Sequence, residues 1–172
     1  MEYVILVDAQ DNAIGTMEKQ QAHVEGLLHR AFSVFIFNSE KKLLLQKRAS
    51  SKYHCGGLWT NTCCSHPRQN ENTHEAAKRR LEEEMGIQCS LTTLFSFLYK
   101  AEFDNGLTEH EVDHVFFGST DETPKLNTLE VEDYRYISIE ELKLEIKEFP
   151  QHFTPWFLIA LNRVLEFNSL QP

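Results

Sequence analysis

SHPRQNENTHEAAKRRLEEEMGI, residues 65–87, is the stretch of sequence that decides the fold of this chain. Asn72 followed three residues later by Glu75 resembles a capping box, which satisfies free backbone N–H groups at a helix start. Gly86 stands where a glycine commonly ends a helix in the left-handed conformation. The stretch therefore predicts a charged helix over residues 75–85.

The charges on this helix do not define a site by themselves. Arg79 with Glu83, and Arg80 with Glu84, are spaced four residues apart, which alone indicates ion pairs on an exposed helix face. A charge-rich helix is usually a solvated one. The function must therefore be sought in what surrounds it.

Runs rich in apolar and β-branched residues predict strands on both sides of this helix, at residues 3–8, 30–37, 42–48, 94–103, 112–119 and 134–137. Near the end, TPWFLIALNRVLEF predicts an amphipathic helix with Pro155 in its first turn. Mixed strands and helices in a chain of 172 residues predict an α/β fold, organised as one domain over residues 1–172.

Composition excludes several classes of function. The net charge of −9 argues against a general nucleic-acid binder, because a phosphate backbone requires a basic surface. No apolar run approaches the roughly 18 residues of a membrane span, and the N-terminus lacks the basic and apolar regions of a signal peptide. The four cysteines include no CxxC pair, so we expect a reducing, cytoplasmic setting.

The loop WTNTCCSHP, residues 59–67, is the first candidate for chemistry. Adjacent cysteines point in different directions, so we expect at most one of Cys63 and Cys64 to face a site. A single cysteine is more often an inert buried thiol than a reactive one. Gly56–Gly57 before the loop and Pro67 at its end indicate a constrained backbone, which favours a site.

Scattered histidines and carboxylates form the second candidate. Glu109 and Glu111 are two residues apart, so on a strand both side chains project from the same face. Imidazole and carboxylate together suit Zn²⁺, Mn²⁺ or Fe²⁺. The candidate ligands are His23, His29, His66, Glu109 and Glu111. We expect the other histidines to be structural or surface residues, namely His54, His74, His110, His114 and His152.

Basic residues form the third candidate, consisting of Lys19, Arg48, Lys52 and Arg80. Each is an ordinary surface charge when taken alone. Arg48 and Lys52 flank the end of a predicted strand, where loops of α/β folds gather ligand-binding groups. Arginine and lysine both suit a diphosphate.

The charged helix resembles the Nudix box, in which a glycine, a glutamate and an Arg-Glu-apolar-x-Glu-Glu-x-Gly-apolar helix bind a divalent metal at a diphosphate. This chain departs from that pattern twice. Ser65 replaces the first glycine, and Arg80 replaces a glutamate that hydrolases of the family use for metal binding and catalysis. Replacing a carboxylate by a cation reverses the local charge, which disfavours a hydrolytic metal cluster there.

The altered helix, the WTNTCCSHP loop and the downstream sequence Glu109-His110-Glu111-Val112 together resemble the type 1 isopentenyl-diphosphate isomerases. The resemblance covers residues 4–156 and includes GTMEKQQAH, HRAF, LLLQKRASSK and FTPW. His23 and His29 are six positions apart, one fewer than in the family pattern.

The resemblance implies a single-domain, Nudix-like α/β/α sandwich with a mixed sheet. It also implies isomerisation of isopentenyl diphosphate to dimethylallyl diphosphate, through protonation and deprotonation around a carbocation-like intermediate. An alkene is a poor base, so such an enzyme must hold acid, base and charge stabilisation together. By resemblance, Cys64 and Glu111 transfer the protons, Tyr99 assists them, and Trp156 closes the pocket and stabilises the cation.

The resemblance further implies two metal sites and a substrate-binding set. One tightly bound divalent metal, Mn²⁺ or Zn²⁺, is expected at the five candidate ligands, and Mg²⁺ at Glu84 with the substrate diphosphate. The residues expected to hold the diphosphate are Lys19, Arg48, Lys52, Ser65 and Arg80. The expected partner is the small isoprenoid diphosphate, with neither nucleic acid nor membrane, and the chain is expected to be a monomer or weak dimer.

Two alternatives remain open on the sequence. The first is a Nudix pyrophosphohydrolase acting on a nucleoside diphosphate derivative, against which Arg80 and the WTNTCCSHP loop both count. The second is a metal- or ligand-binding module without catalytic activity. The simultaneous presence of Cys64, Glu111, Trp156 and the basic residues disfavours it.

Overall fold

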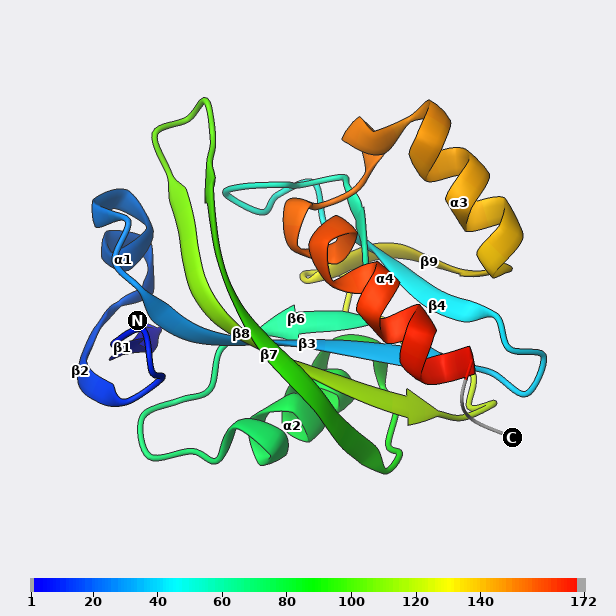
Figure 1. Cartoon of the computed structure of the whole chain (residues 1–172), viewed down its shortest axis with the longest axis horizontal. Coiled ribbons are helices and arrows are strands. Elements are labelled where there is room, and N and C mark those ends of the chain that lie inside the picture. Colours follow the sequence, from blue (N-terminus) through cyan, green and yellow to red (C-terminus); the bar gives the residue numbers. More distant parts are fainter. Residues whose placement is uncertain (1, 170–172) are drawn as a thin grey trace.

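The computed structural model describes residues 2–169 and has an α/β fold (Figure 1). The strands are β1 (Tyr3–Val7), β2 (Ala13–Glu18), β3 (His29–Phe37), β4 (Leu43–Arg48), β5 (Trp59–Thr60), β6 (Cys63–Ser65), β7 (Leu91–Glu102), β8 (Thr108–Ser119) and β9 (Val131–Ile137). The helices are α1 (Lys19–Glu25), α2 (Thr73–Met85), α3 (Ile139–Glu148), the short 3₁₀ helix η1 (Pro150–His152) and α4 (Pro155–Ser169). None of the helices within residues 2–169 is long and apolar enough to span a membrane.

Strand β3 is the organising strand of a mixed sheet. It pairs in parallel with β8 along its length and antiparallel with β1, β4 and β6. Val34 pairs with Cys63 and also with Phe116, so β6 and β8 lie on opposite edges of β3. Strand β7 pairs antiparallel with β8, forming the long hairpin that crosses the middle of Figure 1.

Alternating side chains of β3 supply two cores, one on each face of the sheet. Phe35 and Phe37 pack in the cluster that contains Phe157 of α4, whereas Val34 and Ile36 pack in the cluster that contains α2. Figure 1 shows α4 lying across β3 and β4. The predicted α/β fold with a mixed sheet between helices is therefore confirmed.

Helix α2 ends at Met85, as the sequence predicts, and begins at Thr73, two residues before the predicted start. The Asn72 side chain accepts hydrogen bonds from the backbone N–H groups of His74 and Glu75, at 2.9 and 3.4 Å. Gly86 ends the helix with a φ of 65°, in the left-handed region that favours glycine. A Cβ at Gly86 would lie 2.7 Å from the Cβ of Lys125, so close packing also requires a glycine here.

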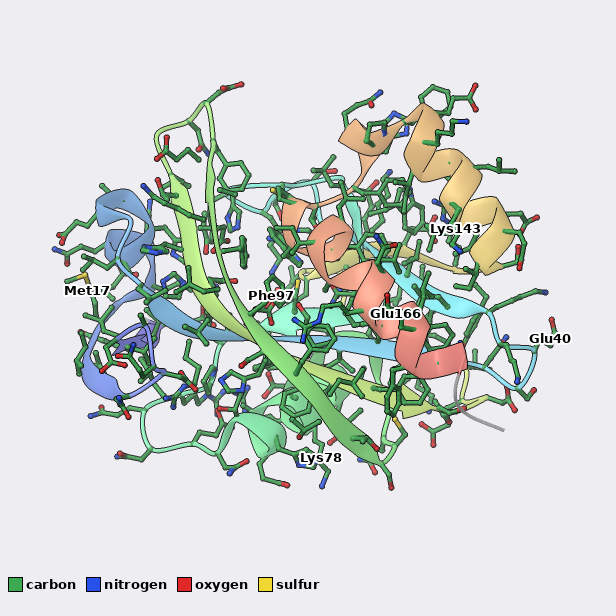
Figure 2. The ribbon with its side chains drawn as sticks, viewed as in Figure 1. Met17, Glu40, Lys78, Phe97, Lys143 and Glu166 are labelled. Atoms are coloured by element: carbon green, nitrogen blue, oxygen red, sulfur yellow. The ribbon has the colours of Figure 1, made fainter. Side chains whose placement is uncertain are left out.

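The sequence pattern does not predict six of the elements, namely β2, α1, β5, β6, α3 and η1. The predicted strand at residues 112–119 begins earlier, at Thr108, and so includes both candidate glutamates. Figure 2 shows the side chains of the described residues, with the labelled Met17 and Glu40 at opposite ends of the view and Phe97 on β7 between them.

Candidate active site and metal centre

Five candidate metal ligands come together although they lie on separate elements. One donor atom from each of five side chains lies within 4.8 Å of all the others, and the residues are His23, His29, His66, Glu109 and Glu111. His23 lies on helix α1 and His29 on β3. His66 directly follows β6, and both glutamates lie on β8. The parallel pairing of β3 with β8 sets His29 opposite Glu111.

Hydrogen bonds to backbone carbonyls orient two of these imidazoles. The Nδ1 of His23 lies 2.6 Å from the Lys19 carbonyl oxygen, and the Nδ1 of His29 lies 2.8 Å from that of Leu27. A carbonyl only accepts, so in both rings Nδ1–H donates, and the Nε2 atoms face the carboxylates. The Nε2 of His29 is buried without a hydrogen-bond partner. This donor set fits a divalent cation such as Zn²⁺ or Mn²⁺.

The charges of the cluster also suit a cation. Burial works against ionisation of Glu109, but hydrogen bonds from His23 and His54 hold its pKa well below the usual range. Burial lowers the pKa of His66 to about 4, so this imidazole is neutral at neutral pH. Metal ligands must be ionised carboxylates and neutral imidazoles. Glu109 and His66 meet these conditions, whereas at His23 burial is outweighed by the neighbouring Glu109, which raises the imidazole pKa.

A cavity of about 40 Å³, partly open to solvent, adjoins this cluster and is lined by both expected proton-transfer groups, Cys64 and Glu111. The hydroxyl of Tyr99 donates to Glu111 Oε2 at 2.6 Å. The Nη1 of Arg48 donates to the sulfur of Cys64 at 3.5 Å. Burial outweighs this neighbouring cation and raises the pKa of the Cys64 thiol to about 12.

The two adjacent cysteines have different surroundings, as the sequence predicts. Cys63 is fully buried in the apolar cluster that packs against α2. Cys64 points to the cavity on the other side of the strand. A Cβ added to Gly56, in the preceding loop, would lie 2.8 Å from the Ser50 carbonyl oxygen. The predicted constraint in this loop is therefore present.

Trp156, near the start of α4, closes one wall of the cavity. It is 4% exposed, and its indole Nε1 is buried without a hydrogen-bond partner. The guanidinium carbon of Arg48 lies 5.3 Å from the centre of its ring. The π face of Trp156 is thus already in cation–π contact with a positive group.

The whole predicted substrate-binding set lines the same cavity, namely Lys19, Arg48, Lys52, Ser65 and Arg80. Carboxylates hold three of these cations. Lys19 donates to Glu2 at 2.8 Å. Glu130 contacts Lys52 and lies 3.3 Å from the Nη2 of Arg80, while Glu84 accepts from that same nitrogen at 2.6 Å. Glu84 also accepts from Gln46 at 3.0 Å. It does not belong to the five-donor cluster found among residues 2–169.

Two residues that sequence reasoning did not select also lie at the site. Asp113 is buried at the cavity wall and accepts from the hydroxyl of Ser33 at 2.8 Å. Burial and the charge of Glu111 raise its pKa well above the usual range. Asp113 continues the two-residue spacing of Glu109 and Glu111 along β8, a signal that was available in the sequence.

The second such residue, His54, was expected to be a structural or surface histidine. It lies between β4 and β5, is 7% exposed and contacts Glu109 through its Nε2. Residues 49–58 contain no helical or strand periodicity, so nothing in the sequence pattern marked this histidine.

Comparison with known proteins agrees with this geometry. The family model described as NUDIX domain matches residues 27–157. The isopentenyl-diphosphate Delta-isomerase of Pectobacterium atrosepticum is 53% identical over 164 residues, which cover 95% of this chain and 92% of the relative. Isopentenyl-diphosphate Delta-isomerase 2 of Aromatoleum aromaticum is 50% identical over 169 residues, covering 98% of this chain and 89% of the relative.

Solved structures support the fold alone, because they are less similar in sequence. DR0079 from Deinococcus radiodurans superposes with a TM-score of 0.71 at 22% identity, covering 86% of this chain and 90% of that one. A MutT NUDIX hydrolase from Burkholderia pseudomallei superposes with a TM-score of 0.64 at 24% identity, covering 80% and 98%. The fold and the match over residues 27–157 define a NUDIX-domain protein. Within that class, the chain belongs to the family of isopentenyl-diphosphate Delta-isomerases.

Proposed function

We propose that this chain isomerises isopentenyl diphosphate to dimethylallyl diphosphate by adding a proton at one carbon and removing one from another. The observation that carries the proposal is the cavity that is lined by a thiol, Cys64, a carboxylate, Glu111, and the ring of Trp156. Family membership supports the same activity, since relatives about 50% identical carry the name of this isomerase.

The protonation states of the two groups suit this chemistry. Burial keeps Cys64 as a thiol, because its pKa is about 12. The pKa of Glu111 is lowered: burial and the charge of Glu109 oppose this, but the neighbouring imidazoles of His29 and His66 outweigh them. One group therefore carries a proton and the other does not, as a reaction that adds one proton and removes another requires.

The sheet supports proton transfer on opposite faces of the substrate. Cys64 is on β6 and Glu111 is on β8, which flank β3 on its two edges. The hydroxyl of Tyr99 donates to Glu111 and holds one carboxylate oxygen in place. A carbocation-like intermediate between these groups would face Trp156, whose π face contributes about 2 kcal/mol when the cation is desolvated.

The metal and the diphosphate have separate roles in the proposal. The five-donor cluster would hold one divalent ion, Mn²⁺ or Zn²⁺, which would fix the Glu111 carboxylate and adjust its pKa. The basic residues of the cavity would hold the diphosphate together with Mg²⁺ at Glu84. That role requires Arg80 to turn from Glu84 toward the phosphates. Action as a monomer or weak dimer in the cytoplasm, and one domain over residues 1–172, stay predictions.

The pyrophosphohydrolase alternative receives less support from the geometry. A hydrolase of this class activates water near phosphorus, commonly with several carboxylates and more than one metal. On α2 the carboxylates of Glu83 and Glu84 are both engaged by Arg80, at 2.9 and 2.6 Å. The neighbouring guanidinium favours holding a diphosphate over attacking it.

Proton NMR in deuterated water tests the proposal directly. Purified protein with Mg²⁺ and isopentenyl diphosphate should form the dimethylallyl product with deuterium at the carbon that gains a proton. Phosphate and pyrophosphate should stay at the level of a control without enzyme. Steady phosphate release without deuterium in any hydrocarbon product would overturn the isomerase in favour of the hydrolase. The absence of both would favour the binding module.

A further inference from the structure

His54 is placed against the metal centre but differs from the three ligand histidines. Its Nε2 contacts Oε1 of Glu109, whereas His23 approaches Oε2 of the same carboxylate at 3.1 Å. The two imidazoles therefore hold opposite oxygens of one glutamate. Its other ring nitrogen, Nδ1, is buried without a hydrogen-bond partner.

The tautomer of His54 follows from these contacts. A carboxylate only accepts hydrogen bonds, so the nitrogen of His54 that faces Glu109 carries the proton. In His23 and His29 a backbone carbonyl accepts from Nδ1–H, so Nε2 is the atom that could bind a cation, whereas Nδ1 of His54 has no such partner. His54 thus acts as a donor to a ligand, and the other two are arranged as ligands.

The loop that carries His54 is fixed from several sides. The Nη2 of Arg48 donates to the carbonyl oxygen of His54 at 3.3 Å. Asn105, in the turn between β7 and β8, donates to the carbonyl oxygen of Tyr53 at 2.9 Å. The His54 ring packs against Tyr53 and Phe103, with centroids 4.5 and 5.4 Å apart. The imidazole is therefore held in one orientation toward Glu109.

We propose that His54 is a positioning residue that holds Oε1 of Glu109, the oxygen that His23 does not approach, and so strengthens divalent-metal binding at the five-donor cluster. This inference rests on the metal centre of the proposed function. Hydrogen bonds to the carboxylates that bind a metal orient them, and their loss typically weakens metal binding by about 10- to 100-fold.

The test measures metal affinity without any need for turnover. Protein freed of metal by chelation is titrated with Co²⁺ or Zn²⁺ against a chromogenic chelator. We expect His54→Ala to weaken binding roughly 10- to 100-fold. His54→Gln, whose amide N–H can still reach Glu109, should recover most of that loss. His114→Ala is the matched control, because His114 forms a comparable pair with Asp11, 2.8 Å apart, on β8 outside the cluster.

The Co²⁺ absorption spectrum separates a positioning residue from a ligand. We expect the ligand-field bands of His54→Ala to keep the positions and intensities of the wild type once Co²⁺ is saturating. A spectrum showing the loss of a nitrogen ligand would overturn the proposal and make His54 a ligand itself. Unchanged affinity in His54→Ala, or an equal loss in His54→Gln, would overturn it as well.

A shorter side chain keeps the test decisive if His54→Ala does not fold. His54→Asn carries the same amide as His54→Gln but is one methylene shorter, so it should bind metal more weakly than His54→Gln. Equal affinities of these two variants would overturn the proposal. Isomerase activity, measured separately by NMR, tells whether the proposed function fails, because the affinity measurement does not depend on it.

Discussion

The metal cluster and the charged helix α2 both gather acidic side chains, but they neutralise them in different ways. On α2, Arg80 contacts Glu83, Glu84 and Glu130, and the charges largely cancel within the protein. In the cluster, Glu109 and Glu111 face imidazoles, which carry no fixed charge. The cluster therefore attracts a cation strongly, whereas the helix presents guanidinium groups that suit an anion.

Because of this difference, a Nudix-like helix can occur in a protein whose proposed reaction is proton transfer and not diphosphate hydrolysis. Arginine at position 80 engages the carboxylates that would otherwise be free to bind metal on the helix. The cluster that could hold a tight metal lies instead at α1, β3, β6 and β8. The proposed proton chemistry depends on the second region and the proposed diphosphate binding on the first, so variants in each should fail differently.

The largest effect is expected between the two regions, at Cys64. Cys64→Ala should lower kcat by at least about 10²- to 10⁴-fold, because it removes one proton-transfer group. Cys63→Ala should retain most activity, since Cys63 packs in the core behind the cavity. NMR of product formation measures both variants, and elemental analysis checks that both still bind metal. The reverse order of activities would show that the wrong member of the pair was assigned.

The next largest effect is a loss of bound metal, which we expect from variants in the cluster but not from variants in the helix. His66→Ala and Glu109→Ala should lose the tightly held ion or bind it much more weakly, since each removes one of five donors. Glu83→Ala, on α2, should keep a full complement. Elemental analysis of protein purified without added metal measures the ratio of ion to chain. Full activity of a metal-free wild type in excess chelator would remove this site from the mechanism.

Stability should follow metal content in the same way. A metal present at 100 times its Kd stabilises the folded state by about 2.7 kcal/mol, because it binds the folded chain and not the unfolded one. For a chain of this length that raises Tm by roughly 5–10 °C. Thermal unfolding of metal-free and refilled wild type measures the rise, and Glu109→Ala should lack it. An equal rise in that variant would place the stabilising ion elsewhere.

Arg80→Gln, on the helix, should weaken substrate binding and leave the metal cluster intact. It removes a charged donor to the diphosphate, and such hydrogen bonds contribute about 1.5–3 kcal/mol, so KM should rise roughly tenfold or more. The cluster should retain its metal, and kcat should fall less than KM rises. Initial rates over a range of isopentenyl diphosphate concentrations measure both constants. Metal loss in Arg80→Gln would show that the two regions are not independent.

The smallest effect concerns alkaline pH. Burial raises the pKa of Cys64 from 9.0 to about 12, so the folded chain holds this proton more tightly than the unfolded chain. The resulting stabilisation is complete below about pH 9 and is lost as pH rises toward 12. Between pH 8 and 10 the wild type should therefore lose about 1 kcal/mol more stability than Cys64→Ala. Urea unfolding at the two pH values measures this, and equal losses would contradict the assigned burial effect.

The sequence predicts elements that have a regular residue periodicity or a recognisable capping residue at their ends. The caps at Asn72 and Gly86 fix α2, and the two-residue spacing of Glu109 and Glu111 places both on one buried face of β8. Short polar elements such as α1 carry too few residues for a period to emerge. The convergence of α1, β3, β6 and β8 depends on long-range pairing, so no local spacing shows that the five candidate ligands meet. The contact of His54 with Glu109 joins residues 55 positions apart, and no motif or spacing in the sequence predicts it.

Glu130 gives the proposed diphosphate site an anion of its own. Its carboxylate contacts Lys52 and Arg80, two of the cations proposed to receive the substrate. Under the proposed function, substrate binding is then an exchange, in which phosphate oxygens replace an internal carboxylate at the same two side chains. An incoming group with a single charge gains little from such an exchange, whereas a diphosphate carries enough charge to drive it. Selection against monoanions therefore needs no steric barrier, because the protein already supplies the competitor.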